Sequence, residues 1–247
     1  MRRRTYHQRY ITDTVKELIG KLKGIAQTSF LIFLCFVSAV GTIDCMGQLE
    51  KLPASAADKG KAQQLCNLYQ KSWSTNPNSA SVSRRQFFTA FPSAFPEFIS
   101  LYGYRETQNS SVLSQLYYEA KSHIDLLNDL DKIIPQSDYY EKLIQLSQSG
   151  YWQADAAGYL QKLIMNKLDQ ELCCFLWFLK KHTDETIFGF WFFYFDGPAP
   201  NKEIPDQLKI IADYDNQIFS AMTDALREVK MKWKDESGLI TPKIQSC

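Results

Sequence analysis

The chain has 247 residues, with 28 basic and 27 acidic side chains, and its composition is 45% hydrophobic and 22% charged. This length fits one large domain or two small ones, and the composition excludes wholesale disorder and a polytopic membrane protein. The 9 prolines and 11 glycines are too few for a collagen-like or low-complexity chain.

The near-neutral net charge hides an asymmetry between the N-terminus and the rest of the chain. Residues 1–23 carry seven basic and two acidic side chains, a net charge of +5, whereas residues 24–247 carry a net charge of −4. Binding to phosphates needs a basic stripe, which such a body does not offer. We therefore expect no nucleic-acid partner.

An apolar run follows the basic arm. Phe30–Val40 contains eleven residues without a charge, with the small residues Ala39 and Gly41 at its end. A basic flank, an apolar run and small residues are the three zones of a secretory signal. Alternatively, the uncharged stretch 24–43 has 20 residues, enough to cross the about 30 Å of a bilayer core as a helix. Both interpretations export the body, and a buried soluble helix is the remaining alternative.

These features divide the chain into four segments. We expect a basic arm with a signal or transmembrane helix at 1–45, a tether at 46–62, an all-helical domain at 63–240 and a tail at 241–247. The positive-inside rule predicts an inner-membrane anchor with the body outside the cytoplasm, or a periplasmic or secreted body if the signal is cleaved. Lipidation is not expected, because no small residue precedes Cys35 or Cys45.

Six cysteines are too few for a disulfide scaffold, and none forms a C-x-x-C motif. Cys173 and Cys174 lie in an apolar stretch and are interpreted as small buried hydrophobic residues. The pairing of Cys45 with Cys66 is the one worth testing.

In chain order, the first helix is predicted at Ala57–Trp73. Ser83 is then expected to cap a helix over Arg84–Phe91, which Pro92 stops. The clearest helical period extends over Ser111–Ile134 and predicts one long helix. Its expected buried side chains are Leu116, Ala120, Ile124 and Leu127, and its expected exposed side chains are Ser122, Asp125 and Asp129.

The following helices are marked by their ends. Asp138 with Glu141 is typical of a capping box, and Gly150 is the expected stop of that helix. The segment 155–182 is helical in pattern, as one helix or as two broken near Asp169. Thr183 is expected to cap the next helix, with two carboxylates in its first turn.

Two further helices complete the expected fold. Ile187–Phe195 is apolar on every side, which predicts a central core helix packed on 172–179, with Gly197 in a left-handed turn behind it. The alternative is that Trp191 or Tyr194 stays exposed at one edge of this helix and forms part of an interface. The last helix is expected to start at Pro205. Its predicted apolar stripe consists of Ile211, Tyr214, Ile218, Met222, Ala225, Val229 and Trp233. No segment alternates with the period of a strand, so we expect one all-α domain of seven to nine helices.

No catalytic, cofactor or metal motif is present. The chain lacks a phosphate-binding glycine loop, a G-x-S-x-G elbow and an H-E-x-x-H pair, and its three histidines are too scattered to form a ligand set. Both His123 and His182 are interpreted as structural. Asp131 falls on the buried stripe of its helix, where it either has a raised pKa or reaches water because the helix bends before Pro135.

Three stretches, at 91–104, 150–160 and 190–198, are rich in aromatic and turn residues. They contain Phe-Pro followed by Leu-Tyr-Gly-Tyr, then Trp-x-Ala-Asp-Ala, then Phe-Trp-x-Phe-x-Phe-Asp-Gly-Pro. In this order and over about residues 85–200, the chain resembles uncharacterised, exported, all-helical proteins of Bacteroides-like bacteria. The resemblance implies an exported helical body, and it carries over no activity and no catalytic residue.

The sequence therefore favours a non-enzymatic interaction module in the cell envelope, held at the membrane by its N-terminal segment and binding a protein partner. The alternatives are a protein that binds a glycan or a small ligand, and a hydrolase that uses Asp131, Asp155 or Asp196. The candidate binding surface consists of Tyr102, Tyr104, Trp152, Asp155, Trp191 and Tyr194.

Overall fold

The chain divides into two units, Met1–Cys45 and Met46–Cys247. The computed structural model describes residues 56–107 and 110–239, all within the second unit. The predicted signal or anchor at Phe30–Val40 lies outside these residues. The described part contains nine α-helices and a two-stranded hairpin, so the expected helical body is confirmed, with one β element added to it.

The first two helices form an antiparallel pair, α3 (Ala56–Lys71) and α4 (Pro77–Ala90). The side chain of Asn76, not Ser83, caps α4, since its Oδ1 accepts the backbone N–H groups of Asn78 and Ser79 at 3.0 and 3.3 Å. Ser83 is buried inside the helix. The expected cap was wrong because Pro77 fixes the first turn two turns earlier.

The long helix predicted at 111–134 is not formed. Instead, α5 (Phe95–Tyr102) ends at Gly103 and leads into β1 (Tyr104–Thr107), which pairs antiparallel with β2 (Ser110–Leu113). The backbone pairing continues past β2, with N–H to carbonyl contacts from Ser114 to Gly103 and from Leu116 to Leu101. Non-local backbone pairing has therefore overridden the local helical period.

The remainder of that segment is helical and keeps the predicted core face. It comprises the 3₁₀ turn η1 (Tyr117–Glu119), α6 (Ala120–Asp129) and the 3₁₀ turn η2 (Leu130–Lys132). All four side chains expected to be buried are buried, namely Leu116, Ala120, Ile124 and Leu127. Of those expected to be exposed, Asp125 and Asp129 are exposed and Ser122 is half-buried.

Helix α7 (Gln136–Ser147) begins after Pro135, with no side-chain cap, so the predicted capping box of Asp138 and Glu141 was wrong. A proline before the first turn already sets the entry of the chain. The next helix, α8 (Ala154–Leu179), contains a break at Glu171 (φ −139°, ψ 42°), close to the predicted one. The break turns the following residues, so Cys173 is exposed and Cys174 half-buried, contrary to the core position expected for both.

Helix α9 (Asp184–Phe195) is the central core helix that its composition predicts, and Thr183 caps it through a contact with the N–H of Thr186. The rings of Phe175 and Phe190 lie 5.2 Å apart, which confirms the expected packing on the end of α8. Gly197 does not adopt a positive φ, in contrast to the expectation. Asp196 follows the helix in extended conformation, and its backbone N–H donates to the carbonyl of Phe192 at 2.9 Å. Its side chain accepts the N–H of Trp152.

The C-terminal segment is broken into the 3₁₀ turn η3 (Asp206–Leu208), α10 (Ile211–Tyr214) and α11 (Asn216–Leu239), not one helix from Pro205. Asp215 is extended and its Oδ1 accepts the N–H groups of Gln217 and Ile218, which starts α11 anew. The predicted stripe is buried at every position except Tyr214, which is exposed, and Trp233, which is half-buried.

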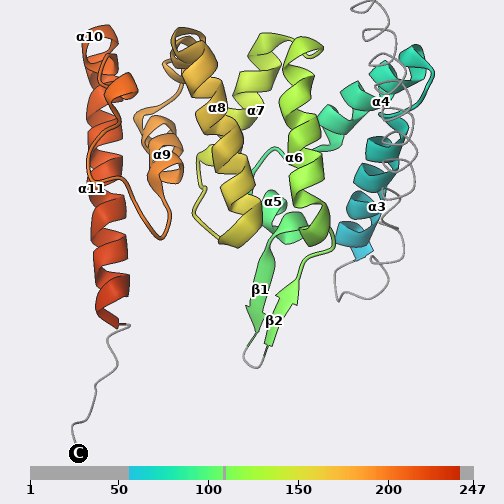
Figure 1. Cartoon of the computed structure of the whole chain (residues 1–247), viewed down its shortest axis with the longest axis horizontal. Helices are drawn as coiled ribbons and strands as arrows, with labels where there is room; N and C mark the ends of the chain where they lie inside the picture. The colour runs from blue at the N-terminus through green and yellow to red at the C-terminus, as the bar shows by residue number, and fades with distance from the viewer. Residues whose placement is uncertain (1–55, 108–109, 240–247) are drawn as a thin grey trace, which may run out of the picture. The chain divides into compact units, whose positions relative to one another are not determined.

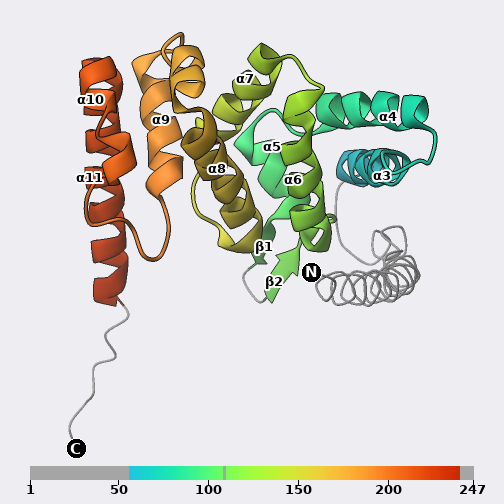
Figure 2. The same cartoon turned by 45° about the horizontal axis from the view of Figure 1, so that its top comes forward.

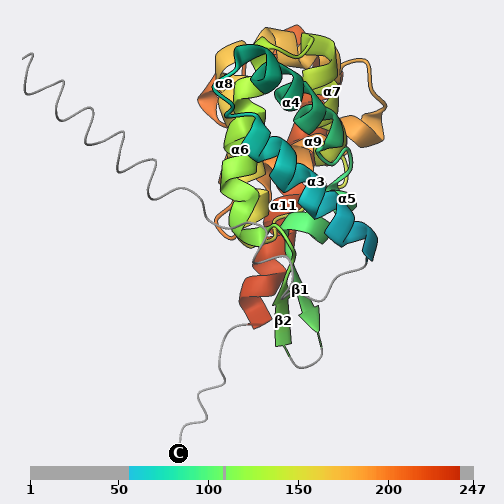
Figure 3. The ribbon, with the colours of Figure 1, turned by 90° about the vertical axis from the view of Figure 1, so that its right-hand side faces the viewer.

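The helices follow one another across this unit in nearly their chain order. Figures 1 and 2 show α3 and α4 on one side, α5 to α8 in the middle, and α9 to α11 on the other side. Figure 3, viewed from the side of α3 and α4, shows the hairpin extending beyond the helices. The closest helix pairs are α9 with α11, α3 with α4, and α6 with α8, so both sides of the unit end in a packed helix pair.

Candidate functional site

The structure does not gather the six predicted surface residues into one site. Tyr102, Trp191 and Tyr194 are all buried, with exposed fractions of 0%, 0% and 4%. Each lies on a helix that is covered by aromatic neighbours, such as Phe98 on Tyr102 and Phe195 on Trp191. These three residues therefore belong to the core and not to an open surface.

The other three predicted residues lie closer to the surface but have separate partners. The backbone carbonyl of Tyr104 accepts a hydrogen bond from Gln153 Nε2 at 2.9 Å. Trp152 is half-buried and packs edge-on against Trp233, with 5.7 Å between ring centroids. Asp155 is exposed and accepts the hydroxyl of Tyr117 at 2.9 Å. Tyr104 thus lies against Gln153, which stands between Trp152 and Asp155 in the chain, and these three residues stay a predicted surface.

Asp196 joins three segments of the fold. Its fully buried carboxylate accepts the N–H of Trp152 at 2.7 Å, Nε1 of Trp233 at 2.8 Å, and Nζ of Lys232 at 2.8 and 3.0 Å. Beside it, Gln161 Nε2 donates to the carbonyl of Asp196 at 2.6 Å. With these four hydrogen bonds, the buried carboxylate ties α9 and α11 to the segment before α8.

The three carboxylates proposed for hydrolysis face different partners. Asp131 lies in η2, half-buried, and forms an ion pair with the buried Lys167 of α8. Asp155 bonds Tyr117, and Asp196 bonds Lys232. The helix does break before Pro135, as one of the two alternatives for Asp131 expected, because Asp131 lies in the 3₁₀ turn η2. The ion pair with Lys167 was not expected from the sequence. Among the described residues, no group of three or more His, Cys, Asp and Glu side chains could hold a metal ion.

His123 and His182, both predicted to be structural residues, each contact a side chain of another part of the fold. His123 is fully buried, and its Nδ1 lies 2.8 Å from the hydroxyl of Tyr102, with the ring of Tyr69 at 4.9 Å. Burial lowers the pKa of His123 from 6.5 to about 3, so the imidazole stays neutral. His182 lies after α8, and its Nε2 is 3.0 Å from Glu141 of α7.

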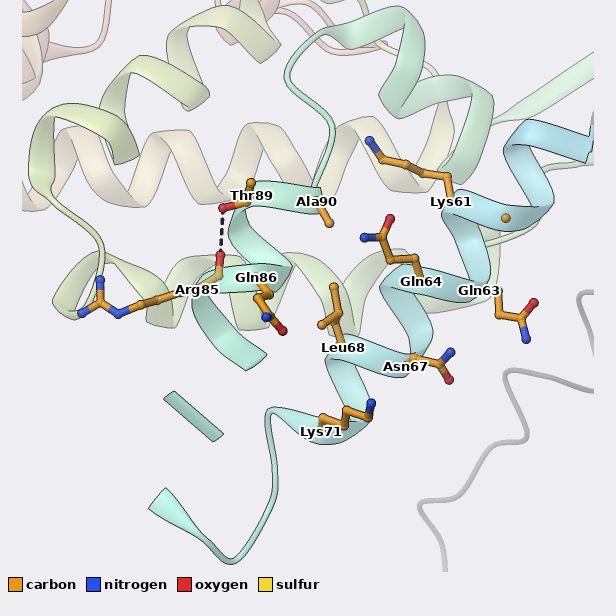
Figure 4. Close-up of a pocket in the computed structure, with 11 residues that line it drawn as sticks. Lys61, Gln63, Gln64, Asn67, Leu68, Lys71, Arg85, Gln86, Thr89 and Ala90 are labelled. Atoms are coloured by element: carbon orange, nitrogen blue, oxygen red, sulfur yellow. Dashed lines mark hydrogen bonds between the residues drawn. The ribbon is translucent and has the colours of Figure 1, made fainter. Parts of the chain in front are cut away.

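A wide surface groove lies between α3 and α4, and we call it the α3–α4 groove. Its volume is about 950 Å³. Figure 4 shows Gln64 and Leu68 of α3 facing Gln86 and Ala90 of α4 across it. The polar side chains that line it are Lys61, Gln63, Gln64, Asn67, Lys71, Arg85, Gln86 and Thr89. Three are cations, five carry an amide or a hydroxyl, and none of the lining residues is acidic.

The charge of the groove continues over the whole helix pair. Residues 56–90 carry five basic side chains and one acidic one, whereas residues 91–239 carry 14 basic and 22 acidic ones. Lys61 and Lys71 are ten residues apart, or about 15 Å along the helix. The groove therefore offers positive charge along its length together with amides that can both donate and accept hydrogen bonds.

Sequence reasoning missed this groove although a signal was present. No acidic residue occurs between Asp58 and Glu97, a charge bias that the net charge of the body conceals. The pairing of the two helices, which turns this bias into one surface, is a tertiary feature.

Comparison of the chain with protein-family models, with curated proteins and with solved structures found no match.

Proposed function

We propose that this protein is an exported or membrane-anchored module of the cell envelope that binds a partner without catalysing a reaction, and that the α3–α4 groove is its binding surface. The partner is proposed to be a protein that presents an extended acidic segment. The observation that carries this proposal is the lining of the groove, where three cations and five amide or hydroxyl side chains occur without a carboxylate.

The chemistry of the groove favours a charged, extended partner over an apolar one. Polar lining residues dominate, and Lys71 and Arg85 are exposed on opposite helices. Lys61 is held by Glu97 at 2.8 Å, so the two exposed cations are the ones available to an incoming carboxylate. Complementary charge raises the association rate and selects the partner, and salt weakens such binding when the charges are exposed.

Export is supported by the N-terminal pattern and by one cysteine. Cys66 of α3 is disulfide-bonded, and disulfides persist mainly outside the reducing cytoplasm. The predicted partner, Cys45, lies outside the described residues. None of the helices within the described part combines the length and hydropathy needed to cross a membrane. The proposed anchor is the uncharged stretch 24–43, which contains the apolar run Phe30–Val40.

The proposal is tested with a labelled peptide rich in Asp and Glu, titrated with the full chain in mild detergent and followed by fluorescence anisotropy. The double variant Lys71→Glu with Arg85→Glu should weaken binding about tenfold or more, which corresponds to about 1.4 kcal/mol. Its control is Lys132→Glu, which reverses an exposed cation in η2 away from the groove. Both variants should melt within about 0.5 kcal/mol of the wild type.

Three outcomes would contradict the proposal. The first is equal loss of binding in the double variant and the control, which would indicate attraction by overall charge. The second is equally tight binding of a Lys-rich peptide. The third is a preference for vesicles of anionic lipid over the acidic peptide, which would assign the groove to a membrane surface.

A further inference from the structure

A second, smaller groove lies between α6 and the first half of α8, and we call it the α6–α8 groove. Its volume is about 200 Å³, and the buried side chains of Ile124 and Leu163 form its apolar base. At about 30 Å³ for each bulk water, this space corresponds to roughly six or seven waters. One six-membered sugar ring with its substituents has a similar size, whereas a larger ligand would not fit.

The two walls of the α6–α8 groove are regular. Lys121, Asp125 and Asn128 follow one another at intervals of four and three residues on α6. Tyr159, Lys162 and Asn166 do so at intervals of three and four residues on α8. These intervals place each set on one helix face, so each turn contributes a polar side chain to the wall. A ligand in the groove would meet hydrogen-bonding groups on both sides and apolar carbon beneath.

The charges in the groove are unequal. Lys121 forms an ion pair with Asp125 at 2.5 Å, which raises the pKa of Lys121, and both of these side chains are largely exposed. Lys162 is exposed and forms no ion pair with any of the described residues. An unpaired cation therefore lines the groove together with the carboxamides of Asn128 and Asn166, which supports an anionic group on the ligand.

One tyrosine, Tyr159, lines the groove, and a second, Tyr117, is linked to the same helix. Tyr159 stands in its wall, one helical turn after Asp155, which accepts the hydroxyl of Tyr117. The rings of Tyr117 and Tyr118 are perpendicular, with 5.4 Å between centroids, and Tyr118 is 64% exposed. An aromatic ring with an apolar face and a polar edge suits the C–H face of a sugar, since it removes apolar area from water without burying hydroxyls.

We propose that the α6–α8 groove binds a single sugar ring that bears a carboxylate, a hexuronate. Lys162 pairs with the carboxylate, Asn128 and Asn166 bond the ring hydroxyls, and the ring of Tyr159 packs on the C–H face. This site is separate from the α3–α4 groove and carries a different ligand class. Either proposal can therefore fail without the other.

The test is a titration of the full chain with sodium glucuronate, glucose and acetate, followed by ligand-observed NMR. Glucuronate should bind with a dissociation constant of about 1 mM, at least about tenfold tighter than either glucose or acetate. Lys162→Gln should remove most of this preference for glucuronate over glucose, whereas Tyr159→Ala should weaken both sugars. Lys132→Gln, outside the groove, should leave every affinity unchanged.

Each other result overturns the proposal. If acetate binds as tightly as glucuronate, Lys162 attracts any carboxylate and the groove does not recognise the sugar ring. An unchanged preference in Lys162→Gln, measured on a variant with a normal thermal melt, would place the ligand elsewhere. Saturation of no sugar at about 50 mM, well above the expected dissociation constant, would remove the site altogether.

Discussion

The α3–α4 pair and the α9–α11 pair lie on opposite sides of the described unit and use their side chains in opposite ways. Between α9 and α11, aromatic rings pack around the buried Asp196, which accepts hydrogen bonds from Lys232 and Trp233. Between α3 and α4, amides and cations line an open groove. The contrast teaches that aromatic residues predicted to form a binding surface, Trp191 and Tyr194, belong to the core. The open surface is formed by α3 and α4, whose outer side chains are polar.

The largest effect is expected at the buried carboxylate. Asp196→Ala should lower the free energy of unfolding by about 3–5 kcal/mol, because it leaves Lys232 and the N–H groups of Trp152 and Trp233 without their acceptor. Urea denaturation measures this loss. The matched control is Asp224→Ala on the surface of α11, where the pair with Arg227 is exposed and should be worth about 0–1 kcal/mol. Similar losses in both variants would refute the role of Asp196 in joining these segments.

A smaller effect is expected where α9 crosses the end of α7. A Cβ on Gly189 would meet the carbonyl group of Gln148, and a backbone oxygen cannot rotate away as a side chain can. Gly189→Ala should therefore cost about 3 kcal/mol in a thermal melt. Gly158→Ala in α8 is the control, since nothing lies within 4 Å of its Cβ, and it should stabilise the helix by up to about 1 kcal/mol. If Gly189→Ala stabilises the protein as much as Gly158→Ala does, then Gly189 does not lie as close to the carbonyl group of Gln148 as the structure shows.

The smallest effect concerns the inner face of the α3–α4 pair, where Phe87 of α4 and Tyr69 of α3 enclose His123. The pKa of His123 is about 3 in the folded protein and 6.5 in the unfolded chain. As the pH falls, the imidazole is therefore protonated in the unfolded state before it is protonated in the folded state. Stability should thus fall as the pH drops from 6.5 towards 3, by about 2 kcal/mol between pH 7 and pH 5.

Denaturant melts at both pH values measure this change, and the variant His123→Gln isolates it. The comparison is needed because burial raises the pKa of Glu119, which makes a contribution of opposite sign. The variant should lose the fall that is due to the imidazole and keep the rest. An identical pH dependence in both proteins would show that water reaches His123 in the folded state.

Local signals were sufficient for several elements. The hydroxyl of Thr183 caps α9 where expected, and the break in α8 lies two residues from Asp169, where one of the two alternatives put it. The side chains Ile124 and Leu127 are buried on the predicted face of α6. In each case the deciding interactions lie within one or two turns of the chain. Helix caps and helical periods depend on residues three or four positions away in the chain, so they can be predicted from the sequence.

The candidate sites depended on contacts across the chain. Trp191 and Tyr194 look the same in sequence whether their rings meet solvent or the rings of Phe190 and Phe195, and the structure buries them. Cys173 changed from core to surface through one distorted residue, Glu171. Sequence periodicity assigns an apolar residue to a face but does not say what covers that face.

By itself, the sequence determined a helical body with an apolar helix at 187–195, because that segment has no polar face to turn towards water. Only the tertiary structure decided the rest. Backbone bonds from residues 114 and 116 back to residues 103 and 101 replaced a predicted helix with a hairpin, and the pairing of α3 with α4 collected scattered cations around one groove. Such contacts bring together residues ten or more positions apart, and their free energy depends on the whole packed fold and not on local propensity.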